Sequence, residues 1–501
     1  MTIIFNNHEF KYEIEAVCKL FFPCILFKHE YQLSDLDRDN LIVTQLKQEQ
    51  QTIYLSTMVR LDGQVFSEQQ CVDSNHIHCE KECERLLAVT VYLALKRATG
   101  IDVKWGVMTG IRPVKQLNYW IEQGHSIQQV KEIFQRDYLA SEEKFELCKQ
   151  VREHQISIID ASKPNSYSLY VSIPFCPTRC SYCSFVSSSI AGTKAKALVN
   201  DYVEKLCEEI RYIGDIVKRF SLSLETIYIG GGTPTTLSAE QLILLTNTIK
   251  QAFLVQDVKE YTIEAGRADT ITREKLLAIR QAGATRISIN PQTFQDHVLK
   301  AIGRKHTVQQ VIDCYHLARE LGFEDINMDL IAGLPEDTLE TFQDTIDKII
   351  ALSPTNVTVH TLTIKRSSDL FQNHEENEKI SDDAIVQMVE YAYQKLTQNG
   401  YYPYYLYRQK NTLQNLENIG YCKKGYEGRY NIYIMEEIHT ILAAGASAVS
   451  KLIRHRSQKV HRIFNYKYPF EYNKDFKTIL ERKNQIAEFY QDINFSLDIH
   501  K

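Results

Sequence analysis

The chain has 501 residues, 44% of them hydrophobic and 24% charged, with a formal net charge of −5. This is the composition of a globular protein with ample material for two or three buried cores. The slightly acidic charge balance gives no global sign of nucleic-acid binding, so a nucleic-acid partner is not expected. The most apolar run, "LFFPCILF", is short and interrupted by Pro23, so no membrane span is expected either.

The start of the chain, "MTIIFNNHEF", has no basic region before its apolar residues, so a signal peptide is not expected. Twelve cysteines in a long chain without such a peptide indicate a reducing cytoplasm rather than a disulfide framework. We therefore expect a cytoplasmic protein.

Residues 1–165 are predicted to form an N-terminal α+β domain of unknown role. A strand is expected at "QTIYLSTMVRL", and helices near "CERLLAVTVYLALKRATG" and "EEKFELCKQVREHQISII". The run "ASKPNSYS", residues 161–168, has the Ser, Asn, Lys and Pro content of a linker. The segment "WGVMTGIRP", residues 105–113, is distinctive but suggests no mechanism.

Residues 166–370 alternate short β-rich runs with longer helical patterns. Six strands are expected, at "SLYVSIP", "ETIYIGG", "EYTIEAG", "TRISINPQ", "DINMDLIAG" and "NVTVHTLTI". Ser238 and Gln241 form a capping-box pattern at the start of the second intervening helix. Repeated strand–helix alternation predicts a parallel sheet with right-handed crossovers. Six strands are too few for a closed eight-stranded barrel, so an α/β fold with an open, partial (βα)6 barrel is expected.

Residues 371–501 are predicted to form a C-terminal α/β extension that completes the substrate site. The region opens with the acidic stretch "NHEENEKISDD". A helix is expected near "AIVQMVEYAYQKLTQNG", and a tyrosine-rich strand at "YYPYYLYRQ".

A cysteine triplet directly follows the first predicted barrel strand. Cys176, Cys180 and Cys183 have the spacing C-x3-C-x2-C, with no fourth cysteine close behind. A structural zinc site usually takes four ligands. Three thiolates on one loop suit a four-iron cluster in which one iron remains open to another ligand. The alternatives are a chance group of loop cysteines and a zinc knuckle.

A glycine-rich turn, "IGGGTPTTL", ends the second predicted barrel strand. Without a Cβ, Gly231 and Gly232 allow the backbone, up to Thr233, to approach a ligand closely, and backbone amides and carbonyls can bind a small charged group. A tight turn explains the same residues about equally well.

Polar side chains mark the ends of further predicted strands. Glu264 ends "YTIE", Gln292 ends "ISINPQ", Asp329 lies in "INMDLIAGLP", and Arg304 lies in "IGRKH". Functional groups gather at the C-terminal ends of strands in parallel βα architectures. A carboxylate can accept hydrogen bonds from a ribose or an amine, and an arginine can bind a carboxylate. Each residue taken alone is better explained as a solvated or structural polar group, and only their shared placement makes the functional interpretation about equally good.

Six motifs occur in a telling order, namely "LYVSIPFCPTRCSYCSF", "GGGTPT", "TIEAG", "RISINPQTF", "IGRKHT" and "NMDLIAGLPEDT". This order resembles radical S-adenosylmethionine (SAM) enzymes, and within them the oxygen-independent coproporphyrinogen III oxidases and their relatives. The resemblance covers residues 166–365. The long N-terminal region and "YYLYRQKNTLQNLENIGYCKKGYEGRYNIYIMEE" are similar to the coproporphyrinogen dehydrogenase (HemZ) branch.

The resemblance implies two cofactors, a [4Fe-4S] cluster and one or two molecules of SAM. Cys176, Cys180 and Cys183 would hold the cluster, whose open iron would take the amino and carboxylate groups of SAM. The implied SAM contacts come from Tyr170, Tyr182 near the adenine, the Gly231–Gly232–Thr233 backbone near the methionine moiety, Glu264, Gln292, Arg304 and Asp329. No catalytic side chain beyond these is identified.

The resemblance also implies the reaction. Reductive cleavage of SAM would produce a 5′-deoxyadenosyl radical, which removes a hydrogen atom from the β carbon of a propionate side chain. Loss of carbon dioxide and one electron would then leave a vinyl group, converting coproporphyrinogen III to protoporphyrinogen IX in haem biosynthesis. The partners are a tetrapyrrole substrate and a reduced electron donor such as flavodoxin or ferredoxin.

Some positions depart from the best-known oxidases of this family. Phe185 stands where they carry a further cysteine, and Ser172 where they carry a histidine. A sister group, the haem-trafficking chaperones, shares the phenylalanine and carries a His-Asn-x-x-Tyr-Trp motif. The corresponding stretch here, Tyr430 to Met435, lacks that histidine. Two alternatives therefore stay open: a haem chaperone on the same fold, and a radical SAM enzyme that acts on another substrate such as RNA.

Two further groups invite interpretation. His76, His78, Cys79 and Cys83 could form a second metal site, although a polar turn that enters a helix is the simpler reading. The basic run "KLIRHRSQKVHR", residues 451–462, could receive carboxylates or nucleic acid, although a solvated basic face is the simpler reading there.

Overall fold

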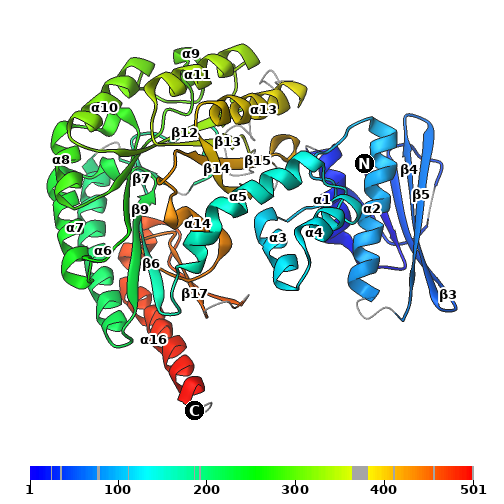
Figure 1. Cartoon of the computed structure of the whole chain (residues 1–501), viewed down its shortest axis with the longest axis horizontal. Coiled ribbons are helices and arrows are strands. Elements are labelled where there is room, and N and C mark those ends of the chain that lie inside the picture. Colours follow the sequence, from blue (N-terminus) through cyan, green and yellow to red (C-terminus); the bar gives the residue numbers. More distant parts are fainter. Residues whose placement is uncertain are drawn as a thin grey trace. The chain divides into compact units, whose positions relative to one another are not determined.

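The computed structural model describes residues 1–498 except 24, 34–35, 76–78, 111, 186, 191–192, 364–381, 410–411, 455–456 and 458. The chain divides into two compact units, and Figure 1 colours them along the sequence. One unit comprises Met1–Gln150 with Tyr407–Glu417, and the other comprises Val151–Leu406 with Asn418–Lys501. The domain boundaries predicted after residues 165 and 370 remain predictions.

The first unit is built on a five-stranded sheet. The strands lie in the order β2-β1-β3-β4-β5. The strands are β1 (Thr2–Asn6), β2 (Lys28–Glu30), β3 (Leu41–Glu49), β4 (Thr52–Leu61) and β5 (Gln64–Asp73). The helices are α1 (Lys11–Phe21), α2 (Cys79–Thr99), α3 (Pro113–Glu122), α4 (Ile127–Arg136) and α5 (Glu142–Asp160). The predicted strand "QTIYLSTMVRL" is β4, and alternate β4 side chains are buried because one face of the strand meets the apolar core.

The distinctive segment around Trp105 is part of the first unit's core. Trp105 is fully buried, and its indole Nε1 donates a hydrogen bond of 2.7 Å to Glu417 Oε2. Lys144 Nζ lies 2.5 Å from the other oxygen of the Glu417 carboxylate, and the Arg408 guanidinium stands 5.0 Å above the Trp105 ring. Because a buried carboxylate must be paired, this network accounts for the grouping of residues 407–417 with the N-terminal residues.

The second unit contains an eleven-stranded sheet in the order β14-β15-β13-β12-β11-β10-β9-β6-β16-β17-β18. All six predicted barrel strands are present and pair in parallel. They are β6 (Ser166–Ile173), β9 (Ser223–Gly231), β10 (Glu260–Gly266), β11 (Arg286–Ile289), β12 (Asp325–Ala332) and β13 (Asn356–Thr361). Their side chains are buried almost continuously, as expected for strands covered on both faces.

Helices connect these strands along the outer side of the sheet, where Figure 1 shows the green helices α6, α7, α8 and α10. They are α6 (Thr193–Lys218), α7 (Ala239–Ala252), α8 (Arg273–Gln281), α9 (Asp296–Ala301), α10 (Val308–Glu320), α11 (Leu339–Leu352) and α13 (Asp382–Gln398). The predicted capping box is confirmed, because Gln241 N donates to Ser238 Oγ and Ser238 N donates to Gln241 Oε1. Within the described ranges, no helix has the length and apolar character that a membrane crossing requires.

C-terminal segments extend both edges of the parallel sheet. Strands β14 (Tyr402–Arg408) and β15 (Glu417–Cys422) lie beyond β13. Strands β16 (Thr440–Ala444), β17 (Val449–Ile453) and β18 (Val460–Phe464) lie beyond β6, with β16 parallel to it. Helices α15 (Pro469–Lys474) and α16 (Phe476–Asp498) follow, and α14 (Arg429–Glu436) packs against β9. Across the described strands, no pairing joins β14 to β18, and the parallel strands with their helices form the predicted α/β fold.

Candidate cofactor site at the strand ends

The three cysteines lie on one loop after β6, near short strands β7 (Phe175–Cys176) and β8 (Ser188–Ser189). Cys180 is buried, while Cys176 and Cys183 are partly exposed. Cys183 N donates to Cys180 O at 3.0 Å and closes a turn between them. Burial raises the pKa of the Cys183 thiol, and the nearby Cys180 and Cys176 raise it further. The loop therefore gathers all three predicted sulfur ligands.

The glycine turn at the end of β9 packs against the cysteine loop. Gly231 has a positive φ of 111°, a conformation that favours glycine. Gly232 N donates to Ile173 O at 2.8 Å, and Thr233 N donates to Phe175 O at 2.7 Å. A Cβ on Gly232 would lie 2.5 Å from Phe175 O, so only glycine permits this approach. Two amides that were expected to face a ligand are therefore bonded to the end of β6 and to the start of the cysteine loop, which leaves carbonyls and side chains for ligand contact.

Three tyrosines, one each from β6, β9 and α14, stack on one another. The Tyr228 and Tyr430 rings lie 4.5 Å apart at 23°, and Tyr170 lies 6.2 Å from Tyr228 and 6.3 Å from Tyr430. The Tyr228 hydroxyl donates to Glu264 Oε1. Burial raises the pKa of Glu264 to about 8, and the nearby Asp329 raises it while the Tyr228 hydrogen bond lowers it. Glu264 is thus a carboxyl group that is easily protonated near neutral pH.

The end of β12 places a second carboxylate beside the first. Asp329 Oδ1 accepts a hydrogen bond of 2.8 Å from Asn327, and its Oδ2 lies 3.8 Å from His360 Nε2 on β13. Burial favours the neutral acid, but His360 and the hydrogen bonds from Asn327 and Thr358 hold the pKa of Asp329 below its ordinary value. His360 belongs to the predicted strand "NVTVHTLTI", but the sequence did not identify it as a site residue.

Gln292 occupies a strained backbone position next to Asp329. It has a positive φ of 70° without being glycine. Gln292 N donates to Asp329 O at 2.9 Å, and Ile331 N donates to Gln292 O at 3.0 Å. The two bonds to β12 hold the residue in this conformation, which costs about 1–3 kcal/mol for a non-glycine residue. Strained residues of this kind cluster at functional sites.

Arg304 connects the cysteine loop to the strand ends. Its Nη1 donates to Asn290 O at 2.6 Å, and its Nη2 donates to the Tyr182 hydroxyl at 3.1 Å. Its Nε is buried and has no hydrogen-bond partner among the described residues. Burial would lower the pKa of Arg304, but Tyr182 and the Cys180 thiol raise it above its ordinary value. Arg304 is therefore a buried cation with a donor left over for a ligand.

The donor set fits the two groups that the resemblance implied. No three His, Cys, Asp or Glu side chains of the described residues are arranged to hold a single metal ion. A four-iron cluster places each thiolate on a different iron, so its ligands do not converge on one point. The unpartnered Arg304 Nε and the carboxylates of Glu264 and Asp329 suit a zwitterionic ligand such as SAM. The assignment of individual residues to the cluster and to SAM remains a prediction.

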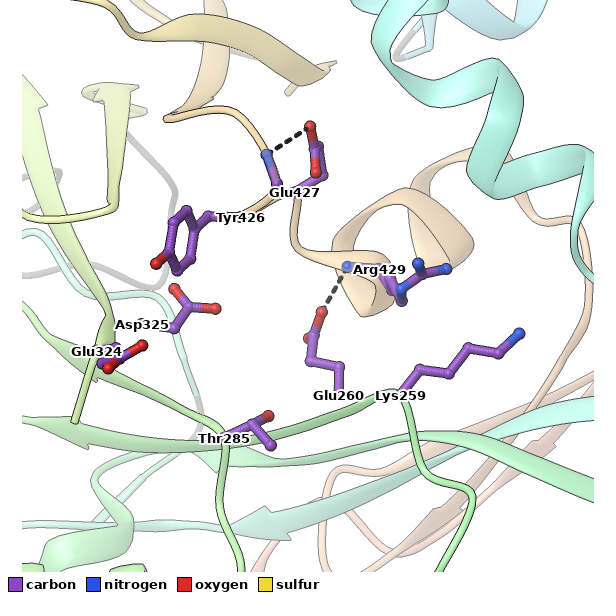
Figure 2. A pocket seen from close by; sticks show the side chains of 9 residues that line it. Lys259, Glu260, Thr285, Glu324, Asp325, Tyr426, Glu427 and Arg429 are labelled. Atoms are coloured by element: carbon purple, nitrogen blue, oxygen red, sulfur yellow. Dashed lines mark hydrogen bonds between the residues drawn. The ribbon is translucent and has the colours of Figure 1, made fainter. Parts of the chain in front are cut away.

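A hollow lies at the opposite, N-terminal ends of the strands. It is lined by Lys259, Glu260, Thr285, Glu324, Asp325, Gly425, Tyr426, Glu427 and Arg429. Figure 2 shows Glu260 directed at the backbone nitrogen of Arg429 rather than into open space. The buried Arg286 lies 3.6 Å from Asp325 and donates to Tyr426 O at 3.4 Å. These charges pair with one another and attach the loop before α14 to the sheet.

The other predicted groups do not gather at the strand ends. Cys79 Sγ and Cys83 Sγ lie 4.0 Å apart on α2, while His76 and His78 lie outside the described residues. In the basic run, Lys451 and Arg462 on β17 and β18 approach Glu437, at 3.8 and 3.6 Å.

A site of this kind on a parallel α/β sheet defines a radical SAM protein, and the family model of the radical SAM superfamily matches residues 170–349. The oxygen-independent coproporphyrinogen-III oxidase-like protein HemZ of Bacillus subtilis is 41% identical over 406 residues, 79% of this chain and 80% of that protein. The chain belongs to the radical SAM family of oxygen-independent coproporphyrinogen III oxidase-like proteins, as its motifs predicted.

Two further relatives define the range of this family. The heme chaperone HemW of Lactococcus lactis is 33% identical over 330 residues, 65% of this chain and 80% of that protein. The solved coproporphyrinogen III oxidase HemN of Escherichia coli, a radical SAM enzyme, has a TM-score of 0.50 and 23% identity, covering 64% of this chain and 72% of that one. This likeness confirms the α/β radical SAM fold. The family's cofactors are a [4Fe-4S] cluster and SAM, as predicted.

Proposed function

We propose that this protein carries out the oxygen-independent oxidative decarboxylation of coproporphyrinogen III to protoporphyrinogen IX in the cytoplasm. The observation that carries the proposal is the 41% identity, over 79% of this chain, to a coproporphyrinogen-III oxidase-like protein. The tetrapyrrole is the substrate, and a reduced flavodoxin or ferredoxin is the electron donor.

The proposed roles of the side chains come from the family resemblance, and their geometry is compatible with these roles. Cys176, Cys180 and Cys183 would hold the [4Fe-4S] cluster, which, with SAM, supplies the radical chemistry that removes a hydrogen atom from a propionate β carbon. Arg304 would donate a hydrogen bond from its unpartnered Nε to SAM. The carboxylate of Asp329 would accept hydrogen bonds from SAM.

The tyrosine stack supports the oxidase proposal over the chaperone alternative. Tyr430 stands where the chaperone motif carries histidine, at the start of α14. Its ring is buried and stacked 4.5 Å from Tyr228, so it packs within the tyrosine cluster, and the histidine ligand of the chaperone motif is absent from this position. This packing supports a protein that encloses SAM and its substrate away from water.

An anaerobic assay tests the proposal. Reconstituted protein would be incubated with SAM, dithionite and coproporphyrinogen III, and the products would be read by mass spectrometry. We expect the mass of the tetrapyrrole to fall in two successive steps that correspond to two decarboxylations. Methionine and 5′-deoxyadenosine should form in proportion to these decarboxylations. Cleavage of SAM without change in the tetrapyrrole would reject this substrate.

A haem chaperone is the second candidate, because the chain matches 80% of a heme chaperone at 33% identity. Stoichiometric haem binding, together with no SAM cleavage in the presence of coproporphyrinogen III, would favour it. A radical SAM enzyme that acts on RNA is the third candidate, and salt-sensitive RNA binding would favour this candidate. The contacts of Lys451 and Arg462 with Glu437 argue for a structural role of those two basic residues.

A further inference from the structure

A buried arginine that the motifs did not single out as a site residue stands behind the cysteine loop. Arg267 follows β10 and is only 3% exposed. Its Nη1 donates to Thr178 O at 3.1 Å and to Thr178 Oγ1 at 2.9 Å. The same Nη1 lies 3.9 Å from Cys180 Sγ. One guanidinium nitrogen therefore holds the backbone of the cysteine loop and faces a predicted cluster sulfur.

The other side of the guanidinium is occupied by a carboxylate. Arg267 Nε and Nη2 donate to the two oxygens of Asp269, at 3.0 and 2.8 Å. Burial favours the neutral acid, but the neighbouring His306 and Arg267 side chains hold the pKa of Asp269 far below its ordinary value. His306 Nδ1 lies 3.5 Å from Asp269 Oδ1. The fork geometry thus fixes the direction of Nη1 toward Cys180.

We infer that Arg267 is a positioning residue for the cluster, and that the Arg267–Asp269 pair sets the reduction potential of the [4Fe-4S] cluster through the Cys180 sulfur. The inference rests on the proposed assignment of Cys180 as a cluster ligand. Hydrogen bonds to cluster sulfurs and nearby charge are main determinants of such potentials. Reduction adds one negative charge to the cluster, so an N–H dipole and a positive charge beside a ligand sulfur favour the reduced state.

The two members of the pair must act in opposite directions. Removal of the Arg267 charge takes away a group that stabilises the reduced cluster, so the midpoint potential becomes more negative. Removal of the Asp269 charge leaves the Arg267 cation uncompensated beside the cluster, so the potential becomes more positive. A purely structural role predicts lower cluster occupancy in both variants, with no opposite shifts in the clusters that remain.

The experiment is a potentiometric titration of the reconstituted full-length protein without SAM, followed by electron paramagnetic resonance. The variants are Arg267→Gln, Arg267→Lys and Asp269→Asn. The matched control is Arg273→Gln, because Arg273 forms a comparable ion pair of 2.7 Å with Glu320 on the exposed surface. Iron content and circular dichroism are measured on every sample.

We expect a more negative potential in Arg267→Gln, a smaller negative shift in Arg267→Lys, a positive shift in Asp269→Asn, and the wild-type value in Arg273→Gln. If Arg267→Gln loses its iron, the sign of the shift in midpoint potential in Asp269→Asn decides whether the inference holds. Unchanged potentials, or shifts of the same sign, in iron-replete Arg267→Lys and Asp269→Asn would overturn the inference. Absence of a cluster in the wild-type protein would instead reject the proposed function.

Discussion

Strand β10 carries two glutamates near its two ends, the buried Glu260 and the partly exposed Glu264, and the two have different neighbours. At the start of the strand, Glu260 accepts hydrogen bonds from Arg429 N and from Thr262, with the Arg286 cation close by. At the end, Glu264 has Tyr228 as its hydrogen-bond donor and the like charge of Asp329 near it. Charges at the start of the sheet are paired with one another, while at the other end Glu264 and Asp329 are like charges near each other and Arg304 Nε has no hydrogen-bond partner among the described residues.

The same contrast holds for the arginines. Burial alone would lower the pKa of Arg286, but Asp325, Tyr404 and Glu260 raise it well above its ordinary value. Arg304 is equally buried, yet its Nε lacks a hydrogen-bond partner among the described residues. A buried donor without a partner costs about 1–3 kcal/mol, a cost that a bound ligand removes. Of these two buried arginines, therefore, only Arg304 has a donor that a ligand could still satisfy.

At the C-terminal ends of the parallel strands, loss of a cysteine should have the largest effect on cofactor binding. Cys176→Ala, Cys180→Ala and Cys183→Ala should each abolish the cluster signal in anaerobically reconstituted protein. Cys207→Ala and Cys314→Ala should retain it, because these cysteines lie in α6 and α10 and pack against their neighbours. The measurement is iron content with electron paramagnetic resonance. Full zinc occupancy without iron after reconstitution would contradict the cluster assignment.

At the N-terminal ends of the parallel strands, loss of Arg286 should have the largest effect on stability. Arg286→Met leaves Asp325 and Glu260 without their buried cation, so the free energy of unfolding should fall by about 3–5 kcal/mol. SAM affinity of the folded protein should stay within twofold of wild type, about 0.4 kcal/mol. Urea denaturation and equilibrium dialysis measure the two quantities.

A surface control accompanies this variant. Arg273→Met removes an exposed ion pair and should cost only about 0–1 kcal/mol in unfolding free energy. A weakened SAM affinity in Arg286→Met would mean that the paired charges also shape the ligand site, and the comparison between the two ends would fail.

The two aspartates of β12, Asp325 and Asp329, allow a matched comparison in which the expected effect on SAM binding is the next largest. Asp329→Asn should weaken SAM binding by about ten- to a hundred-fold, the cost of about 1.5–3 kcal/mol for a charge-assisted hydrogen bond. Arg304→Lys should have a similar effect because lysine lacks the planar fork. Asp325→Asn, at the other end of the strand, should lower stability and leave SAM affinity unchanged. Wild-type affinity in the Asp329 and Arg304 variants would show that both are structural.

The smallest expected effect is a pH dependence. The raised pKa of Glu264, about 8, means that its carboxyl group is mostly protonated at pH 7 and increasingly ionised above it. If SAM binds the ionised form, its apparent affinity should rise about fivefold between pH 7 and pH 8, in proportion to the ionised fraction. Glu264→Gln should abolish this rise, and Glu260→Gln should preserve it. Isothermal titration calorimetry at both pH values measures the affinities, and a rise that persists in Glu264→Gln would assign it to another group.

The sequence by itself determined much of this protein. Alternation of β-rich and helical runs predicted all six parallel strands, because strands buried on both faces and amphipathic helices leave different periodic patterns. The capping box at Ser238 and Gln241 was also readable, since it depends only on residues three apart. The cysteine spacing and the ordered motifs predicted the family, because these residues lie in short local segments.

Only the tertiary structure decided which polar residues are paired and which are not. Tyr228, His360 and Arg267 were missed because their neighbours come from distant segments, and no local pattern records a contact between β10 and the cysteine loop. Trp105 acquired a role only when Glu417, 312 positions away, met its indole. Glu260 and Glu264 lie four residues apart on one strand, and the sequence singled out Glu264 by its place near the strand end without showing which charges surround either residue. Their difference is electrostatic, and it depends on which charges the folded sheet brings within a few ångströms.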